Sequence, residues 1–301
     1  MKRDFLTLWD LSSQEINFLL KRAIELKSGK DIHKCPLIGR SIALLFEKAS
    51  TRTRVSLEVG IYQLGAKAIY MNPKEIQLGR GETVPDTAKV LSRYLDAIVV
   101  RTYSHHTLIE FASNSSIPVI NGLSDLHHPC QALADLMTIL EKKGKLKSVR
   151  LAYIGDGNNV ANSLIEAASR MLINLTIACP KGYEPDPDVL KRARASAKSE
   201  IVILRDPKKA VNGADAVYTD VWVSMGQEKE SKTKRVKLKG YQINNKILSY
   251  AKKDAIVLHC LPAHRGEEIT DDVLDGPRSV VIDQAENRLH TQKALLEFLL
   301  T

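Results

Sequence analysis

Short runs of apolar residues recur along the chain, separated by stretches long enough for a helix. Such uninterrupted runs are typical of parallel strands that are buried on both faces. The stretches between them carry helix signals: Ser12 and Glu15 form a capping-box pattern, and residues 16–24 repeat apolar positions at the three-four spacing of one buried helix face. The pattern predicts strands at residues 42–46, 68–71, 97–100 and 117–120, and a second series at 151–154, 175–178, 201–204, 216–218, 255–258 and 280–282.

The two series predict an α/β protein with two doubly wound domains, each built on a central parallel sheet. A length of 301 residues fits two domains. Residues 129–143 begin with a proline suited to a first helical turn and end in a basic turn, so we expect a helix that joins the domains. We predict one domain over residues 1–144 and another over 145–284, with an amphipathic helix over 285–301 that suits either.

Composition narrows the class of protein. The chain is 44% apolar and 26% charged, and no run approaches the roughly 18 apolar residues of a membrane span. Its first 16 residues lack the apolar stretch of a secretory signal, and its four cysteines form no CxxC pair. We therefore expect reduced thiols, a cytoplasmic location and no membrane partner.

The net charge of +9 raises the question of nucleic-acid binding. Residues 228–253 hold nine basic and two acidic side chains, whereas residues 254–301 hold four and nine, so the excess is local. Tyr241 and Tyr250 are the only aromatic residues in the basic stretch, and no nucleic-acid-binding motif surrounds it. We interpret it as a solvated face and expect no nucleic-acid partner.

Polar residues follow the first predicted strand, where open parallel sheets bind ligands. Ser50, Thr51, Arg52 and Thr53 precede a helix-compatible stretch, and hydroxyls, a guanidinium and the free N–H groups of a helix start together favour a phosphate. Arg52 and Arg54 lie about 200° apart around a helix, so only one of them can face the anion, and we select Arg52. An ordinary helix cap flanked by surface arginines is the alternative.

Other candidates belong to the same sheet edge. Arg101 ends the third predicted strand, and His128 and Gln131 follow the fourth. Cations, hydroxyls, an imidazole and an amide together suit a small phosphorylated carbonyl compound, because some groups bind phosphate while others polarise the carbonyl.

The second half has its own polar edge. Residues 155–160 look like a dinucleotide fingerprint, but Val160 takes the place of the third glycine and no acidic residue follows at the ribose-binding distance, so we expect no nicotinamide or flavin cofactor. Residues 220–226 and 259–262 offer a carboxylate, a hydroxyl and a thiol after two further strands. This set suits a zwitterionic amino compound.

Five segments carry a resemblance to a known family. They are FEKASTRTR at 46–54, HPCQ at 128–131, DVWVSMG at 220–226, HCLPAHRGEE at 259–268 and ENRLHTQKALL at 286–296. In this order and spacing they resemble the ornithine carbamoyltransferases of the aspartate/ornithine carbamoyltransferase superfamily. The resemblance spans nearly the whole chain. It implies a carbamoyl-phosphate domain, an ornithine domain, two interdomain helices, the C-terminal one packing back on the first domain, and no cofactor or metal.

The resemblance also implies a reaction of arginine biosynthesis or urea-cycle type, catalysed by a homotrimer or a multiple of trimers. Carbamoyl phosphate and L-ornithine would be the substrates. By this resemblance the residues that bind carbamoyl phosphate are Ser50, Thr51, Arg52, Thr53, Gln77, Arg101, His128, Gln131, Cys260, Leu261 and Arg288, of which Gln77 would reach a neighbouring subunit. The residues that bind ornithine are Asn159, Asp220, Ser224 and Met225. The catalytic residues are Arg101, His128 and Cys260.

Several residues favour ornithine over aspartate as the acceptor. Lys48 stands where the aspartate enzymes have proline, Arg80 where they have lysine, and HCLP at 259–262 replaces their HPLP. A carboxylate at Asp220 would attract an ammonium and repel a second substrate carboxylate.

The implied mechanism is direct attack of the δ-amine on the carbamoyl carbon, which gives citrulline and phosphate without a covalent enzyme intermediate. Carbamoyl transfer to aspartate or putrescine, and a non-catalytic regulatory subunit that binds a phosphometabolite, are the functional alternatives. Cys260 as a covalent nucleophile and a metal site are the chemical ones. The residues available to a metal are His127, His128, Cys130, His259, Cys260 and His264, whose spacing matches no common zinc pattern.

Overall fold

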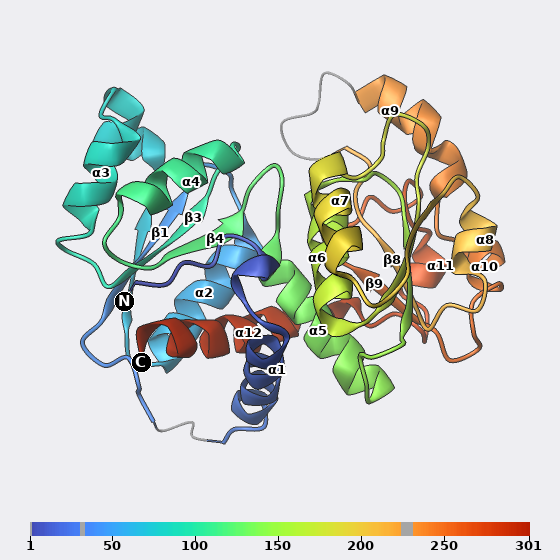
Figure 1. Ribbon diagram of the computed structural model, residues 1–301, viewed down its shortest axis with the longest axis horizontal. Helices are drawn as coiled ribbons and strands as arrows, with labels where there is room; N and C mark the ends of the chain where they lie inside the picture. Colours follow the sequence, from blue (N-terminus) through green and yellow to red (C-terminus); the bar gives the residue numbers. More distant parts are fainter. Residues whose placement is uncertain (1, 31–33, 224–230) are drawn as a thin grey trace. The chain divides into compact units, whose positions relative to one another are not determined.

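The computed structural model describes residues 2–30, 34–223 and 231–301 (Figure 1). The chain divides into two compact units, residues 1–134 with 286–301 (unit 1) and residues 135–285 (unit 2). Each unit holds one parallel sheet, which confirms the predicted α/β class. The strands are β1 (Ser41–Phe46), β2 (Lys67–Met71), β3 (Ala97–Arg101) and β4 (Val119–Leu123) in unit 1, and β5 (Arg150–Ile154), β6 (Asn174–Ala178), β7 (Ile201–Leu204), β8 (Ala216–Thr219) and β9 (Ile256–His259) in unit 2.

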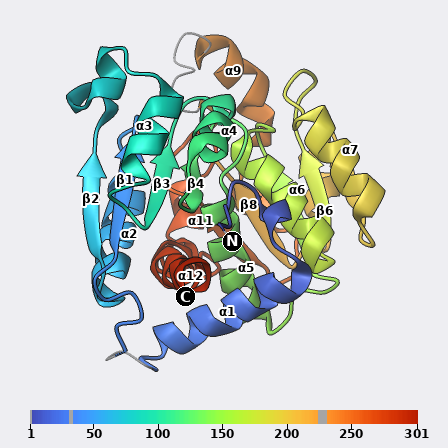
Figure 2. The ribbon, with the colours of Figure 1, turned by 60° about the vertical axis from the view of Figure 1, so that its left-hand side comes forward.

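The sheet of unit 1 has the strand order β2-β1-β3-β4. Helices α3 and α4 pack on one face, where their apolar side chains join those of β1, β3 and β4 in one core cluster, and α2 lies on the other face (Figure 2). Right-handed crossovers require this placement, because the chain reverses its direction across the sheet after β2. The helices of this unit are α1 (Ser13–Lys27), α2 (Thr51–Gln63), α3 (Val84–Leu91) and α4 (His105–Asn114), with 3₁₀ turns η1 (Leu8–Asp10), η2 (Pro73–Glu75) and η3 (Gln77–Arg80).

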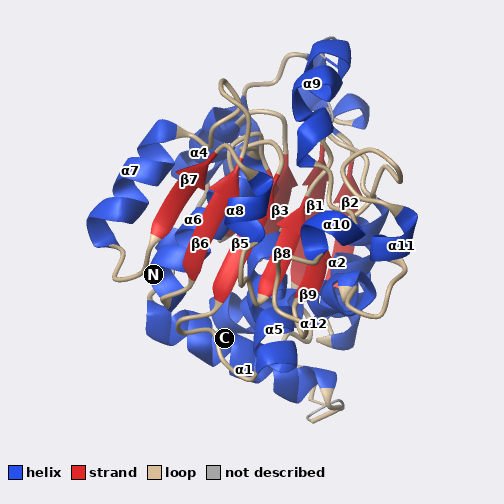
Figure 3. Cartoon of the chain, turned by 90° about the vertical axis from the view of Figure 1, so that its right-hand side faces the viewer, coloured by secondary structure: helices blue, strands red, loops and turns tan. Residues whose placement is uncertain are grey.

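The sheet of unit 2 has the strand order β7-β6-β5-β8-β9 (Figure 3). Alanine and β-branched side chains of β5, β8 and β9 form a core with α8, α10 and α11 on one face, and α6 and α7 cover the other. The helices are α6 (Asn159–Met171), α7 (Pro187–Ser196), α8 (Pro207–Val211), α9 (Ser231–Leu238), α10 (Asn245–Leu248) and α11 (Asp271–Leu274), with a 3₁₀ turn η5 (Lys239–Tyr241).

The division between the units falls within two helices, α5 (Pro129–Lys143) and α12 (Val281–Leu300). The part of α12 in unit 1 packs closely on α2, since a side chain at Gly60 would lie 3.1 Å from Lys293 and 3.3 Å from Leu289. A larger residue at this crossing would therefore force the Lys293 or Leu289 side chain to move by a few tenths of an ångström.

The capping box that begins α1 is confirmed. Ser12 accepts a hydrogen bond from the Glu15 N–H at 3.2 Å, and the Glu15 carboxylate accepts one from the Ser12 N–H at 2.8 Å. The apolar positions after them, from Ile16 to Ala23, are buried as the spacing predicts. Among the described residues, no helix combines the length and apolar character needed to cross a lipid bilayer.

Two strand predictions are wrong in detail. Residues 280–282 form no strand: Ser279 makes one isolated bridge to Val257, and α12 begins two residues later with Ile282 exposed. A run of three apolar residues does not distinguish a strand from the first turn of a helix. The strand predicted at 117–120 lies at Val119–Leu123 instead, because β4 continues into the polar and glycine positions that follow the apolar run.

Candidate active site

In unit 1 the order in which the chain adds strands to the sheet reverses between β1 and β3. The chain leaves β1 toward β2 on one side, while β3 pairs with the other side of β1 and aligns Arg101 with Phe46. Open α/β sheets bind their ligands beyond the strand ends at such a switch point. A register shift in the β3–β4 pairing falls between Val100 and Arg101, and irregularities of this kind reorient a side chain at a strand end.

Helix α2 begins after a loop of four residues that follows β1. Ser50 caps it by accepting a hydrogen bond from the Thr53 N–H at 3.3 Å, and the Thr53 side chain is buried. The guanidinium of Arg54 is engaged elsewhere: it contacts Glu58 at 2.9 Å and lies 3.7 Å from the centre of the Tyr70 ring. Thr51 is exposed and Arg52 half-buried at the same helix start.

Arg288 of α12 joins three of the residues that the sequence singles out. Its guanidinium, in a side chain only 3% exposed, donates to Thr53 Oγ1 at 2.8 Å and to Gln131 Oε1 at 2.7 Å. It also lies 3.2 Å from His128 Nε2. The structure thus brings Thr53, His128, Gln131 and Arg288 into one buried cluster within unit 1.

These contacts fix the state of His128. A guanidinium has only donors, so Nε2 of His128 accepts from Arg288 and the ring carries its proton on Nδ1. Burial, followed by the charges of Arg288 and Arg101, lowers the pKa of His128 well below its ordinary value. His128 is therefore a neutral imidazole at physiological pH.

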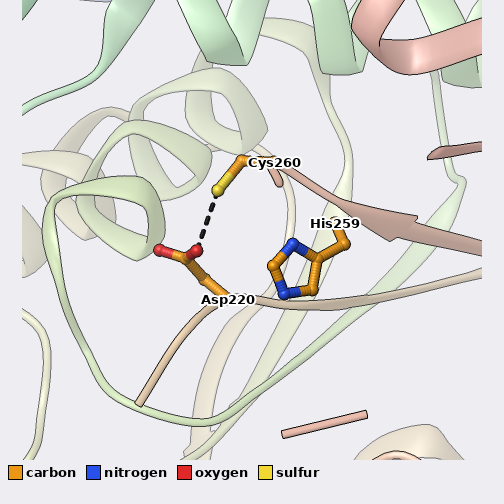
Figure 4. Close-up of side chains that lie close together, drawn as sticks. All are labelled: Asp220, His259 and Cys260. Atoms are coloured by element: carbon orange, nitrogen blue, oxygen red, sulfur yellow. Dashed lines mark hydrogen bonds between the residues drawn. The ribbon is translucent and has the colours of Figure 1, made fainter. Parts of the chain in front are cut away.

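The switch point of unit 2 lies between β5 and β8. Ile154, Thr219 and His259 are aligned across β5, β8 and β9, so the residues that follow them leave the sheet at one edge. Asp220 and Cys260 come together there: the Cys260 thiol donates to Asp220 Oδ1 at 2.8 Å (Figure 4). The Asp220 carboxylate is only 4% exposed.

Asn158, the neighbour of the predicted Asn159, contacts Asp220. Its Nδ2 donates to Asp220 Oδ2 at 2.6 Å, and its Oδ1 caps α6 by accepting from the N–H of Val160 at 3.0 Å. Asn159, the predicted position, is the first residue of α6. Two adjacent asparagines carry the same sequence signal, and only the cap geometry distinguishes them.

The interpretation of the basic stretch as a solvated face is wrong at Lys234. This side chain of α9 is only 3% exposed, and its ammonium lies 2.5 Å from Asp156 Oδ2 in the turn after β5. Lys232 and Lys237 on the same helix are exposed, as expected. The helical pattern of the sequence does not predict the burial of Lys234, because this lysine differs from the neighbouring lysines only in its acidic partner.

Gly157 shows how tightly this turn is packed. A Cβ at this position would lie 2.2 Å from the backbone nitrogen of Pro185, so no other residue fits. The glycine that resembled part of a dinucleotide fingerprint therefore serves the packing of the turn between Asp156 and Asn158.

The two chemical alternatives, a metal site and a covalent role for the thiol, concern the residues around Cys260. Asp220, His259 and Cys260 have potential ligand atoms within 4.8 Å of one another. Nδ1 of His259 accepts the Leu261 N–H at 2.8 Å and Nε2 lies 3.2 Å from Glu268, so both ring nitrogens already have partners within the protein. The other cysteine near a histidine pair, Cys130, is buried, and burial raises its pKa to about 11.

The remaining predicted residues are placed as follows. Leu261 directly follows Cys260 and has a left-handed backbone, with φ of 54°. Gln77 is exposed at the start of η3 in unit 1. Ser224 and Met225 lie outside the described residues.

Comparisons with known proteins agree along the whole chain. Residues 3–141 match the family model described as aspartate/ornithine carbamoyltransferase, carbamoyl-P binding domain. Residues 147–299 match the model described as aspartate/ornithine carbamoyltransferase, Asp/Orn binding domain.

Individual relatives are similar in sequence and in structure. The ornithine carbamoyltransferase of Syntrophus aciditrophicus is 54% identical over 302 residues, which cover all of both chains. The solved ornithine carbamoyltransferase of Pyrococcus furiosus superposes with a TM-score of 0.93 at 51% identity, covering 98% of this chain and 96% of its own. The anabolic enzyme of Campylobacter jejuni gives 0.94 at 42%, covering 99% of each chain. This chain belongs to the aspartate/ornithine carbamoyltransferase family.

Proposed function

We propose that this protein transfers the carbamoyl group of carbamoyl phosphate to the δ-amine of L-ornithine, giving L-citrulline and phosphate. One observation carries the proposal: the switch point of unit 1 holds a buried cationic cluster, and the equivalent place in unit 2 holds a buried carboxylate. An anionic first substrate and an ammonium-bearing second substrate fit these charges. The names of the similar proteins favour the same reaction.

Carbamoyl phosphate binds to unit 1 in this proposal. The phosphate lies at the start of α2, where the N–H groups and hydroxyls of Ser50, Thr51 and Thr53 face it. Arg52 supplies the cation, because Arg54 is already engaged with Glu58 and Tyr70.

The carbamoyl carbonyl is polarised by Arg101 and His128. Its oxygen gains negative charge as the amine attacks, and donors fixed in advance stabilise that charge without reorganisation. His128 acts as a neutral donor because its pKa is lowered by burial. Gln131 and Arg288 complete the carbamoyl-phosphate site, with Gln131 near the carbamoyl nitrogen.

Ornithine binds to unit 2 through its α-amino acid end. The Asp220 carboxylate attracts the α-ammonium, with Asn159, Ser224 and Met225 as further contacts. Asn158 holds Asp220 in place through its amide. The nearby Asp156 carboxylate is neutralised by its ion pair with Lys234, so Asp220 supplies the negative charge.

The attacking δ-amine must lose a proton. A lysine-like amine with a pKa near 10.4 lies about three units above pH 7, which costs roughly 4 kcal/mol. Cys260 relays that proton: its sulfur takes the proton of the amine while the thiol passes its own proton to the Asp220 carboxylate. Together with Leu261, Cys260 contacts the carbamoyl group. Phosphate is a good leaving group, so no covalent intermediate on the thiol is needed.

We further propose that residues 1–144 with the helix over 285–301 act as the carbamoyl-phosphate domain and residues 145–284 as the ornithine domain. The working form is a trimer or a multiple of trimers, in which the exposed Gln77 of one subunit reaches the site of another. The wide spacing of the four cysteines, with no CxxC pair, suits a reducing compartment such as the cytoplasm. Sedimentation and activity of Gln77→Ala mixed with an inactive Arg101→Ala chain would test subunit sharing.

The test of the reaction is direct. Purified protein is incubated with carbamoyl phosphate and ornithine, aspartate, putrescine or no acceptor, and the ureido product is measured. Citrulline from ornithine alone is the expected result. A preference for aspartate or putrescine would contradict the role of Asp220, and no product with any acceptor would favour a binding subunit without catalytic activity.

A further inference from the structure

The His259 side chain lies at the end of β9 and is completely buried together with its partner Glu268. Its Nδ1 accepts a hydrogen bond from the backbone N–H of Leu261 at 2.8 Å. A ring nitrogen that accepts from an N–H carries no proton, so the single proton of the ring is on Nε2. That nitrogen lies 3.2 Å from Glu268 Oε1 and donates to it. The two contacts define one tautomer of a neutral ring.

Both ends of this arrangement are fixed. Glu268 Oε1 also accepts the backbone N–H of His264 at 2.5 Å. The backbone N–H of His259 donates to Gln284 Oε1 at 2.9 Å, and Gln284 in turn donates to Asp135 at 2.7 Å. The His259 ring is therefore held by the backbone N–H of Leu261 at Nδ1 and by the Glu268 carboxylate at Nε2.

The ring contacts a segment with an unusual backbone. Leu261 has φ of 54°, a left-handed conformation that is unfavourable for a residue with a side chain. The backbone N–H of Leu261 is hydrogen-bonded to His259 Nδ1, and Cys260 lies between these two residues in the sequence. The Cys260 thiol then meets Asp220 Oδ1 at 2.8 Å (Figure 4).

We propose that His259 is a positioning residue: by accepting the Leu261 N–H it fixes the left-handed backbone that aims the Cys260 thiol at Asp220, and Glu268 holds the ring in the required tautomer. The role of this geometry in citrulline formation rests on the proposed function. The ring touches no substrate in this scheme, because both of its nitrogens are occupied within the protein.

Two substitutions separate the two hydrogen bonds of the ring. In His259→Asn the amide oxygen replaces Nδ1 and still accepts the Leu261 N–H. In His259→Gln the amide nitrogen replaces Nε2 and still donates to Glu268, but the acceptor for Leu261 is lost. Both variants remove similar volume from the same buried place, so each controls for the cavity made by the other. His259→Asn combined with Glu268→Gln avoids leaving a buried carboxylate without its donor.

The first measurement is the alkylation rate of Cys260 by iodoacetamide in a Cys35→Ser background. Cys130 and Cys179 react slowly, because burial raises the pKa of each thiol to about 11. We expect His259→Gln to alkylate about tenfold faster, since a thiol released from its hydrogen bond to Asp220 is free to attack the reagent, and the Asn variants to stay within about threefold of the parent. Equal rates in the Gln and Asn variants would overturn the proposal.

The second measurement is kcat for citrulline formation. A fall of about tenfold in His259→Gln, with KM for carbamoyl phosphate unchanged and the Asn variants close to the parent, is expected. Equal losses of kcat in all variants would instead indicate a merely structural role and overturn the proposal.

The tautomer is tested separately by ¹⁵N spectra of histidine-labelled protein, in which His259 is assigned by its loss in His259→Asn. We expect an Nε2–H signal with an unprotonated Nδ1 at pH 7, and an Nδ1–H signal would overturn the proposal. The alkylation and the spectra need no substrate. If the wild-type protein forms no citrulline, the proposed function fails while these two measurements still decide the position of His259.

Discussion

The two units share the same kind of parallel sheet but bury opposite charges beyond their strand ends. In each, a cluster of polar side chains lies beyond the strand ends of a parallel sheet whose strand order reverses. Unit 1 fills this place with the guanidinium of Arg288 and the side chains of Thr53, His128 and Gln131. Unit 2 fills it with the carboxylate of Asp220 and its two donors.

The difference teaches that the fold supplies the place and the side chains supply the selectivity. A parallel sheet brings strand ends to one edge whatever residues they carry. Which ion is then favoured depends on the charges buried there, because a low-dielectric environment strengthens each of them. Changing one charge in either unit should therefore affect one substrate and spare the other.

The largest effect is expected from Arg101→Ala. Removing a fixed donor from the developing oxyanion lowers kcat by about a hundredfold to a thousandfold. Steady-state kinetics measure it, and urea unfolding measures whether the fold is kept. Arg40→Ala is the matched control: this arginine of unit 1 is exposed and pairs with Asp96. Near-wild-type turnover of Arg101→Ala would remove Arg101 from the mechanism.

A second large effect is expected on stability in unit 2. Lys234→Met keeps the length of the side chain but leaves the Asp156 carboxylate buried without its cation, which lowers the free energy of unfolding by about 3 kcal/mol. Urea unfolding measures the change. The exposed Lys232→Met on the same helix should stay within about 0.5 kcal/mol of the parent. Restoration by the double variant Lys234→Met, Asp156→Asn is expected, and its absence would contradict the ion-pair explanation.

Asp220→Asn gives a smaller effect and sharpens the contrast between substrates. It keeps the shape of the side chain and removes the charge, so KM for ornithine rises about tenfold to thirtyfold while KM for carbamoyl phosphate changes less than about threefold. Kinetics with each substrate varied in turn measure the ratio. If both KM values rose together, the assignment of one substrate to each cluster would be wrong.

The smallest effect expected concerns pH: His128 should leave no titration step in the pH profile of kcat/KM for ornithine. The pKa of His128 is lowered well below 6.5, so the ring stays neutral as pH falls through that value, while the ornithine amine gains protons over the whole range. The logarithm of kcat/KM for ornithine should therefore rise with a slope of about one from pH 6 to pH 8. A slope approaching two below pH 6.5, lost in His128→Asn, would mean that His128 titrates normally.

The sequence predicts most of the fold because buried parallel strands leave a simple mark. Continuous apolar runs locate β1, β3 and β5 within a residue or two. The failure at residues 280–282 comes from a run of three, too short to choose between a strand and the helical turn that forms there. β4 is misplaced because its second half carries Asn121 and Gly122, which no apolar pattern includes.

The site is predictable to a smaller degree. Motif positions identify Thr53, His128 and Gln131, but their contacts with Arg288 join residues more than 150 positions apart in the sequence. The choice between two adjacent asparagines and the burial of Lys234 depend on three-dimensional neighbours that periodicity does not encode.

Unit 1 is discontinuous in the sequence, and this sets an order during synthesis. Its segment 286–301 leaves the ribosome only after all of unit 2, a delay on the order of ten seconds or more at usual translation speeds. Until then Thr53, His128 and Gln131 lack Arg288, and α2 lacks the helix that packs on Gly60. The nascent chain thus completes unit 2 first, and unit 1 becomes whole only after residue 288 has been translated.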